Sequence, residues 1–220
     1  MSRFFSKYLS SFFPAERIQT PYNYLEVNKL NGHWVLDSSH VNYSFGTLHT
    51  VFQDALNLFV PDISTIHETL ILGFGAGSVA HILQKERQYK GNITGVEIDP
   101  KVIDLGKKYF HLDNIGNLSL HITDAFRFTE ENKIKFDLII VDLFTDNVIP
   151  ETFEKETFLT HVKDSLQPGG ILLYNRMNYS PAERMKTKKF SKSFHSVFAN
   201  CKISEEQTIQ IKNKIFFAQK

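Results

Sequence analysis

One stretch of the chain, residues 69–100, limits the available folds more than any other. An apolar run ends in three glycines at alternate positions, Gly73, Gly75 and Gly77, a helical pattern follows, and a second apolar run ends near Glu97. This order is typical of a strand, a tight glycine turn, a helix and a parallel strand with a carboxylate at its end. The stretch therefore predicts an α/β fold built on a mostly parallel sheet.

Each part of this stretch has a use in binding a nucleoside. Glycines allow the backbone to turn sharply and a ligand to approach it closely. The N-terminus of the following helix offers free N–H groups and a positive partial charge. The carboxylate of Glu97 can accept hydrogen bonds from two neighbouring ribose hydroxyls. We therefore expect a nucleoside-containing cofactor to lie across residues 73–77, Glu97 and the adjacent Ile98.

The rest of the chain continues the alternation of strands and helices. Apolar runs predict strands at residues 118–122, 136–141 and 171–174, with helical patterns between them, and a closing strand pair near residues 202–204 and 208–218. This alternation is typical of a three-layer α/β sheet with helices on both faces. Such sheets bind ligands outside the carboxyl ends of their strands.

Acidic residues close three of the predicted strands at that end. Besides Glu97, the pair Asp124-Ala125 follows residues 118–122, and Asp142 follows residues 136–141. Because the carboxyl ends of parallel strands meet at one edge of a sheet, we expect these side chains to surround one site.

The N-terminal part of the chain has a different pattern. Residues 2–13 carry aromatic residues at helical spacing, which predicts an amphipathic helix that packs on this domain or on a second subunit, with membrane-surface attachment as the alternative. Asn31-Gly32 between two strand-like runs predicts a β-hairpin, and residues 46–59 predict a helix. We expect an N-terminal unit at residues 1–60 and a nucleotide-binding domain at 61–220. We also expect a homodimer, because the aromatic helix at residues 2–13 could pack on a second subunit.

Composition excludes several classes of function. The formal net charge of +1 gives no field for nucleic acid or an anionic membrane, and no apolar run approaches the roughly 18 residues of a membrane span. A single cysteine, Cys201, argues against a disulfide framework and thiolate metal sites, and the histidines lack metal-ligand spacing. We expect a cytoplasmic protein without a metal, acting on a small molecule.

The glycine loop alone leaves two kinds of cofactor open. Gly75 to Ala80 also satisfy the dinucleotide pattern G-x-G-x-x-A, which keeps NAD as a candidate. The chain is short for a NAD enzyme with a second nucleotide-binding half. Asp124-Ala125 suits an adenine amino group, and the closing strand pair is typical of S-adenosylmethionine-dependent folds.

Five segments together resemble a known family. ILGFGAGS, GVEIDPKVIDLGKKYF, HITDAFRF, FDLIIVDLF and KNKIFFA are similar to the spermidine synthase (polyamine aminopropyltransferase) family, which shares the class I S-adenosylmethionine methyltransferase fold. The resemblance spans roughly residues 21–218. It implies a Rossmann-like sheet with a C-terminal antiparallel strand pair and a small N-terminal hairpin element.

The resemblance also implies roles for single residues. Glu97 would hold the ribose hydroxyls, Asp124 and Ala125 would hold adenine, and the glycines would cradle the donor. Asp142 would be the catalytic aspartate that receives or positions the proton of an attacking amine, and it would also border the donor. The donor would be S-adenosylmethionine or its decarboxylated form.

The acceptor side departs from the family pattern. The acidic pair and tyrosine before the nucleotide domain are absent, leaving Tyr22, His49 and Asp146 as pocket candidates. A dicationic diamine needs carboxylates or aromatic faces to replace its water. From the sequence we therefore expect methyl transfer to an unknown small acceptor, which could be an amine. Aminopropyl transfer from decarboxylated S-adenosylmethionine is the alternative, and a non-catalytic nucleotide-binding protein is a third.

Overall fold

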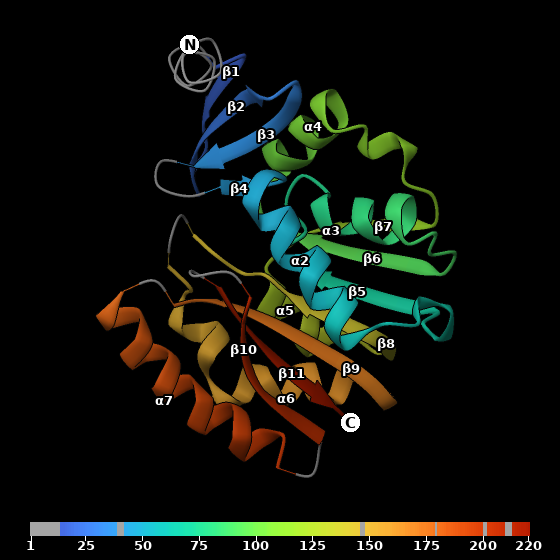
Figure 1. Ribbon diagram of the computed structural model, residues 1–220, viewed down its shortest axis with the longest axis vertical. Helices are drawn as coiled ribbons and strands as arrows, with labels where there is room; N and C mark the ends of the chain where they lie inside the picture. Colours follow the sequence, from blue (N-terminus) through green and yellow to red (C-terminus); the bar gives the residue numbers. More distant parts are fainter. Residues whose placement is uncertain (1–13, 39–41, 146–147, 179, 200–201, 210–212) are drawn as a thin grey trace.

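The computed structural model (Figure 1) describes residues 14–38, 42–145, 148–178, 180–199, 202–209 and 213–220. The helix predicted over residues 2–13 lies outside them, as do Cys201 and Asp146. The elements follow in the order β1 (Glu16–Gln19), β2 (Tyr24–Leu30), β3 (His33–Ser38), β4 (Asn42–Ser44), α2 (Gly46–Phe59), η1 (Ile63–Thr65), β5 (Glu68–Leu72), α3 (Ser78–His81), η2 (Ile82–Glu86), β6 (Asn92–Glu97), α4 (Pro100–Tyr109), η3 (Leu112–Asn114), β7 (Leu118–Ile122), α5 (Ala125–Glu131), β8 (Phe136–Val141), η4 (Glu151–Glu154), α6 (Glu156–Ser165), β9 (Leu166–Met177), α7 (Pro181–Val197), β10 (Lys202–Ile209) and β11 (Asn213–Gln219).

A seven-stranded sheet in the order β10-β11-β9-β8-β5-β6-β7 forms the centre of the fold. Strands β7, β6, β5, β8 and β9 pair in parallel, and β11 pairs antiparallel with both β9 and β10. The predicted α/β fold class, with its C-terminal antiparallel pair, is confirmed. The strand order reverses between β5 and β8, and parallel sheets bind their ligands at such a switch point.

Helices cover both faces of this sheet (Figure 1). On one face α2 and the α3–η2 segment pack on Ile71 and Ile140. On the other face α5, α6 and α7 pack on the neighbouring strand residues Leu70 and Ile139. Successive strand side chains point to opposite faces, so an unbroken apolar strand buries both sides. The central strands are therefore enclosed, and polar groups concentrate at the strand ends.

A second sheet, in the order β1-β2-β3-β4, lies beside α4 near the N-terminal end of the described chain (Figure 1). The predicted hairpin is confirmed as β2–β3, because Asn31 and Gly32 have φ angles of 52° and 87°, both positive as a type I′ turn requires. Strands β1 and β4 enlarge this hairpin beyond the prediction. Its apolar face, with Leu25 and Leu36, packs against Ala76 of the glycine loop and Leu105 of α4.

Two boundaries differ from the sequence prediction. The helical pattern after the three glycines forms a short α-helix, α3, continued by the π-helical turn η2. The strand predicted at residues 171–174 is longer, because β9 also includes residues 167–170, where its register with β8 shifts. The N–H of Gly169 donates to the carbonyl of Lys220 at 2.7 Å, so the end of the chain pairs with these residues. Among the described helices, none is long and apolar enough to cross a membrane.

Candidate functional site

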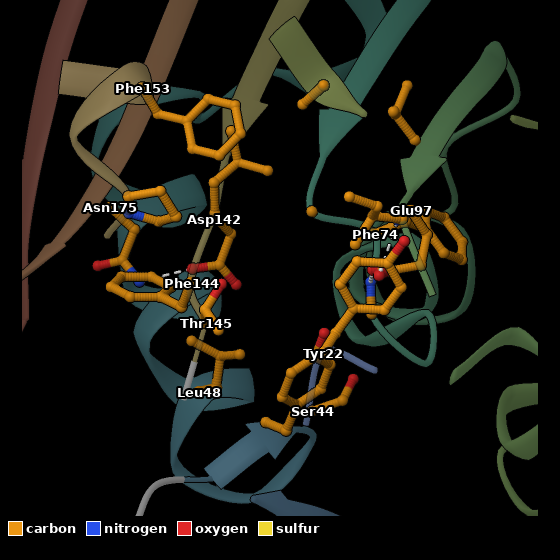
Figure 2. A pocket seen from close by; sticks show the side chains of 18 of the residues that line it. Tyr22, Ser44, Leu48, Phe74, Glu97, Asp142, Phe144, Thr145, Phe153 and Asn175 are labelled. Carbon is orange, nitrogen blue, oxygen red and sulfur yellow. Dashed lines mark hydrogen bonds between the residues drawn. The ribbon is translucent and has the colours of Figure 1, made fainter. Parts of the chain in front are cut away.

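A cavity of about 260 Å³ opens at the carboxyl ends of the central strands. Glu97, Asp124 and Asp142, the acids that close β6, β7 and β8, all line it. In Figure 2, Asp142 and Asn175 lie on one side of the cavity, and Glu97 lies on the opposite side with Phe74 and Tyr22. The predicted convergence of these three acids on one cavity is therefore observed.

Gly73 brings the two central strand ends together. A Cβ atom at this position would lie 2.2 Å from the carbonyl oxygen of Asp142, and the φ angle of Gly73 is +82°. Only glycine fits such an approach without displacing the facing backbone. The N–H groups of Gly73 and Phe74 both donate to the carbonyl of Val96, at 3.0 and 2.9 Å. The first glycine of the loop thus sets the spacing of the site.

Glu97 anchors the glycine loop from the end of β6. Its Oε2 accepts from the N–H of Gly75 at 2.9 Å, and its Oε1 accepts from the N–H groups of Ile98 and Asp99 at 3.0 Å each. Burial of this side chain, which is 3% exposed, raises the pKa of Glu97, although these backbone donors act in the opposite direction. The carboxyl group therefore holds the loop and lies at the cavity wall.

Asp142 sits at the end of a chain of amide groups. The Nδ2 of Asn175 donates to Oδ1 of Asp142 at 2.8 Å, and Nδ2 of Asn213 donates to Oδ1 of Asn175 at 3.1 Å. Desolvation raises the pKa of Asp142 to about 7, and the charge of Glu97 contributes in the same direction while the bond from Asn175 opposes it. This carboxyl group therefore titrates near neutral pH, as a general acid or base requires.

Asp124 caps the helix that follows β7. Its Oδ1 accepts from the N–H groups of Phe126 and Arg127, at 2.9 and 3.1 Å, in the manner of a helix N-cap. Ala125 and Ile98 line the cavity beside it, and Ile98 is 38% exposed despite its apolar side chain. An acid, a backbone N–H and an exposed apolar side chain together suit a flat heterocycle with polar edges.

The other predicted site residues have different placements. Gly75 and Tyr22 line the cavity. Gly77 is the N-cap of α3, with a φ angle of 96°, and is not among the lining residues. The side chain of His49 contacts Ser78 and Glu86 and is not among them either. Asp146 lies outside the described residues.

Asn175, Asn213 and Tyr43 line the cavity without having been predicted from the sequence. Burial, and then the negative charges of Glu97, Asp99 and Asp142, raise the pKa of Tyr43 well above its ordinary value, so this hydroxyl keeps its proton. Asn175 directly follows the predicted strand at residues 171–174, so the strand-end rule that selected the acids also applies to it. No sequence pattern of this kind pointed to Tyr43 or Asn213.

The charge of the cavity is one-sided. Its lining, within the described part of the chain, has three carboxyl side chains and no lysine, arginine or histidine. Aromatic rings at Tyr22, Tyr43 and Phe144 add electron-rich faces. Carboxylates and aromatic faces both favour cationic ligands.

Comparison with known proteins identifies the family. The Spermine/spermidine synthase domain matches residues 57–211. The chain belongs to the spermine/spermidine synthase family. A probable polyamine aminopropyl transferase from Bifidobacterium longum is 31% identical over 208 residues, which cover 90% of this chain and 45% of that protein. The chain thus spans less than half the length of this relative.

Solved structures share the fold. A probable spermidine synthase from Corynebacterium glutamicum matches 93% of this chain and 80% of its own, with a TM-score of 0.77 and 19% identity. Human methyltransferase-like protein 13 in complex with SAH matches 78% of each chain, with a TM-score of 0.58 and 22% identity. Family members and methyltransferases therefore share this sheet, as the resemblance implied.

Proposed function

We propose that this protein is an aminopropyltransferase that transfers the aminopropyl group of decarboxylated S-adenosylmethionine to an amine. The observation that carries the proposal is the charge of the cavity, where Glu97, Asp124 and Asp142 face no basic side chain among the described lining residues. A sulfonium donor and an amine acceptor are both cationic, so this lining attracts both.

The same observation favours one donor over the other. S-adenosylmethionine carries a carboxylate, which buried sites commonly hold with an arginine or lysine. The decarboxylated donor carries only an ammonium group at that position. A described lining with three acids and no base therefore suits the decarboxylated form better. The aminopropyltransferase name of the Bifidobacterium longum relative favours the same reading over methyl transfer.

We assign the donor to the β6 and β7 side of the cavity. Glu97 would accept from the ribose hydroxyls at lone pairs that the backbone donors leave available. Asp124 and the N–H of Ala125 would pair with the edge of adenine, and Ile98 would cover its face. The glycine loop would allow the donor to approach the backbone at Gly73 and Gly75.

Asp142 is the proposed general base. An alkylamine is mostly protonated near pH 7 and attacks only as the neutral amine, so a proton must leave it. A carboxyl group with a pKa of about 7 can accept that proton near neutrality. The N–C bond forms as the C–S bond of the activated donor breaks, the bonding electrons leave with sulfur, and the amine proton passes to Asp142.

The N-terminal unit would supply the acceptor side. Tyr22, Ser44 and Leu48, from the proposed unit at residues 1–60, also line the cavity. Tyr22 is 40% exposed, so its ring is available to an ammonium group entering the cavity. We infer that residues 61–220 hold the donor and that residues 1–60 help to select the amine.

One experiment separates this proposal from its two competitors. The protein is incubated with either donor and a panel of amines and diamines, and thioether and amine products are identified by chromatography and mass spectrometry. We expect methylthioadenosine and an aminopropylated amine from the decarboxylated donor only. Asp142→Asn should lower the rate by about 10²–10⁴-fold and leave donor affinity within a few-fold of the parent. A methylated product from S-adenosylmethionine alone, or donor binding without turnover across the panel, would overturn the proposal.

A further inference from the structure

A group of metal-binding side chains lies behind the glycine loop, outside the cavity lining. His49 on α2, His81 at the end of α3 and Glu86 at the end of η2 each offer one ligand atom, and these atoms lie within 4.8 Å of one another. Nε2 of His49 is 2.6 Å from Oε1 of Glu86, and Nδ1 of His81 is 3.7 Å from the same oxygen. Three potential ligands from two packed helices thus converge on one point.

The π-helical turn explains how His81 and Glu86 come together. An α-helix has 3.6 residues per turn, which places residues i and i+5 on different faces. The wider i to i+5 turn of a π-helix brings such a pair closer together, and π-bulges occur frequently at functional sites. Here η2 covers Ile82–Glu86 directly after His81. The π-helical turn therefore brings the side chains of His81 and Glu86 closer together than a regular α-helix would.

One buried nitrogen atom of this group lacks a hydrogen-bond partner. Nδ1 of His81 is buried and has no hydrogen-bond partner among the described residues. Oε1 of Glu86, at 3.7 Å, is too distant for a hydrogen bond. Buried polar atoms nearly always have a partner, so this nitrogen indicates a missing one.

Hydrogen bonds to neighbouring side chains orient the other two residues, His49 and Glu86. Oγ of Ser78 lies 2.8 Å from Nδ1 of His49, and Nε2 of Gln53 donates to Oε2 of Glu86 at 2.7 Å. In this structure Nε2–H of His49 donates to Oε1 of Glu86, and a metal would replace that proton while Nδ1–H donates to the Ser78 hydroxyl. Outer hydrogen bonds of this kind orient histidine and carboxylate ligands at metal centres.

The ring of Phe45 fixes the two imidazoles against each other. It stacks on His49 with ring centres 5.6 Å apart and meets His81 edge-on at 5.9 Å. The side chains of His81 and Glu86 remain 38% and 33% exposed, so an ion and a water ligand have access from solvent. Ring contacts thus order the two histidines on the side that faces the protein, and the other side of the group is accessible to solvent.

We propose that His49, His81 and Glu86 form a binding site for a divalent transition-metal ion, with Zn²⁺ as the best fit. Two imidazole nitrogens and one carboxylate are ligands that Zn²⁺ takes, with water in the fourth position. The ion would join α2 to the start of the helix that follows the glycine loop. The site is independent of the proposed transferase reaction.

The test uses the full chain without an affinity tag and without donor or amine. Titration with Co²⁺ should give visible absorption of a low-coordinate complex that saturates at one ion per chain, and Zn²⁺ should displace it. Saturating Zn²⁺ should raise the thermal unfolding midpoint by on the order of 5 °C. His81→Ala and Glu86→Gln should each weaken Zn²⁺ binding by about tenfold or more.

His67→Ala is the matched control, because His67 is exposed and uses only its backbone in the described contacts. Its affinity for Zn²⁺ should equal that of the parent. Circular dichroism of each variant confirms folding, and His81→Ala should fold because Nδ1 of His81 has no hydrogen-bond partner to lose. Absence of stoichiometric binding, or equal affinity in His81→Ala and the parent, would overturn the proposal whatever the outcome of the transferase assay.

Discussion

Asn175 on β9 donates from Nδ2 to Oδ1 of Asp142, at the end of the neighbouring strand β8, over 2.8 Å. This bond joins two parallel strands at the point where each enters the cavity. It also opposes the desolvation that raises the pKa of Asp142 to about 7. The bond from Asn175 therefore lowers the pH at which the proposed base carries its charge, against the larger effect of burial.

Removing this bond should move the pH dependence of the reaction. Asn175→Ala leaves the carboxylate of Asp142 with less stabilisation, so its pKa should rise by about one unit, the scale of one hydrogen bond to a charged group. Because the carboxylate is the active form, the acidic limb of kcat/KM against pH should shift upward. Asn213→Ala, which removes only the donor to Asn175, should shift it less. An acidic limb that stays at the parent position would contradict this role.

Asp142 should also impose a pH-dependent cost on stability. Its pKa is raised from 3.8 to about 7 in the folded protein, so the folded state holds its proton more tightly than the unfolded state. The associated stability is complete below about pH 4 and is lost as pH rises to about 7. Asp142→Asn should therefore be more stable than the parent at pH 8 by about 1–3 kcal/mol.

The gain is smaller than the full pKa shift implies, because the half-buried side chain of Asp142 still borders the cavity and is partly screened by water. Urea unfolding at pH 4, 6 and 8 measures the difference, which should shrink toward pH 4. The exposed acid Asp104 gives the control Asp104→Asn, which should follow the parent at all three values. An advantage of Asp142→Asn that is equal at pH 4 and pH 8 would mean that the charge of this residue is not the cause.

Glu97→Ala should weaken binding of the donor. The substitution removes the proposed acceptor of the ribose hydroxyls and frees the N–H of Gly75. The loss should be about 1–3 kcal/mol, the scale of a lost hydrogen bond to a charged group. Calorimetry with methylthioadenosine measures it without turnover. Glu130→Gln, at an exposed position, is the control, and unchanged affinity of Glu97→Ala would place the ribose elsewhere.

Gly73→Ala should destabilise the protein more than a typical surface substitution. The added Cβ would meet the carbonyl oxygen of Asp142 at 2.2 Å, and a φ angle of +82° is unfavourable for alanine. The two effects should together cost about 2–5 kcal/mol. The matched control is Gly116→Ala, where an added Cβ has no atom within 4 Å. Chemical denaturation compares the two, and similar midpoints would contradict the close approach of these strand ends.

The sequence predicted the α/β scaffold and much of the site because both depend on local patterns. Apolar runs, helical spacing and the Asn31-Gly32 turn can each be recognised from residues that are close together in the sequence. The rule that ligands meet the carboxyl ends of parallel strands then placed Glu97, Asp124 and Asp142 together. The same rule applied to residues 171–174 would have added Asn175.

Other features needed long-range contacts. Nothing near His49 in the sequence indicates that it meets Ser78 and Glu86, because these contacts follow from the packing of α2 on α3 and η2. Tyr43 lies on β4, and its place at the cavity follows from the packing of the N-terminal sheet on the glycine loop. The expectation of methyl transfer rested on the absence of family motif residues from the sequence. The three acids and the lack of bases in the described cavity lining instead support the proposal of aminopropyl transfer.

The sequence by itself determined the order of strands and helices, the glycine turn and the acids that close the strands, because these depend on backbone geometry and the alternation of apolar residues. Only the tertiary structure decided the ionisation of Asp142. The pKa of Asp142 depends on desolvation by the surrounding protein, on the charge of Glu97 and on an amide 33 residues away. Electrostatic energies depend on distance and solvent in three dimensions, which the linear order of residues does not contain.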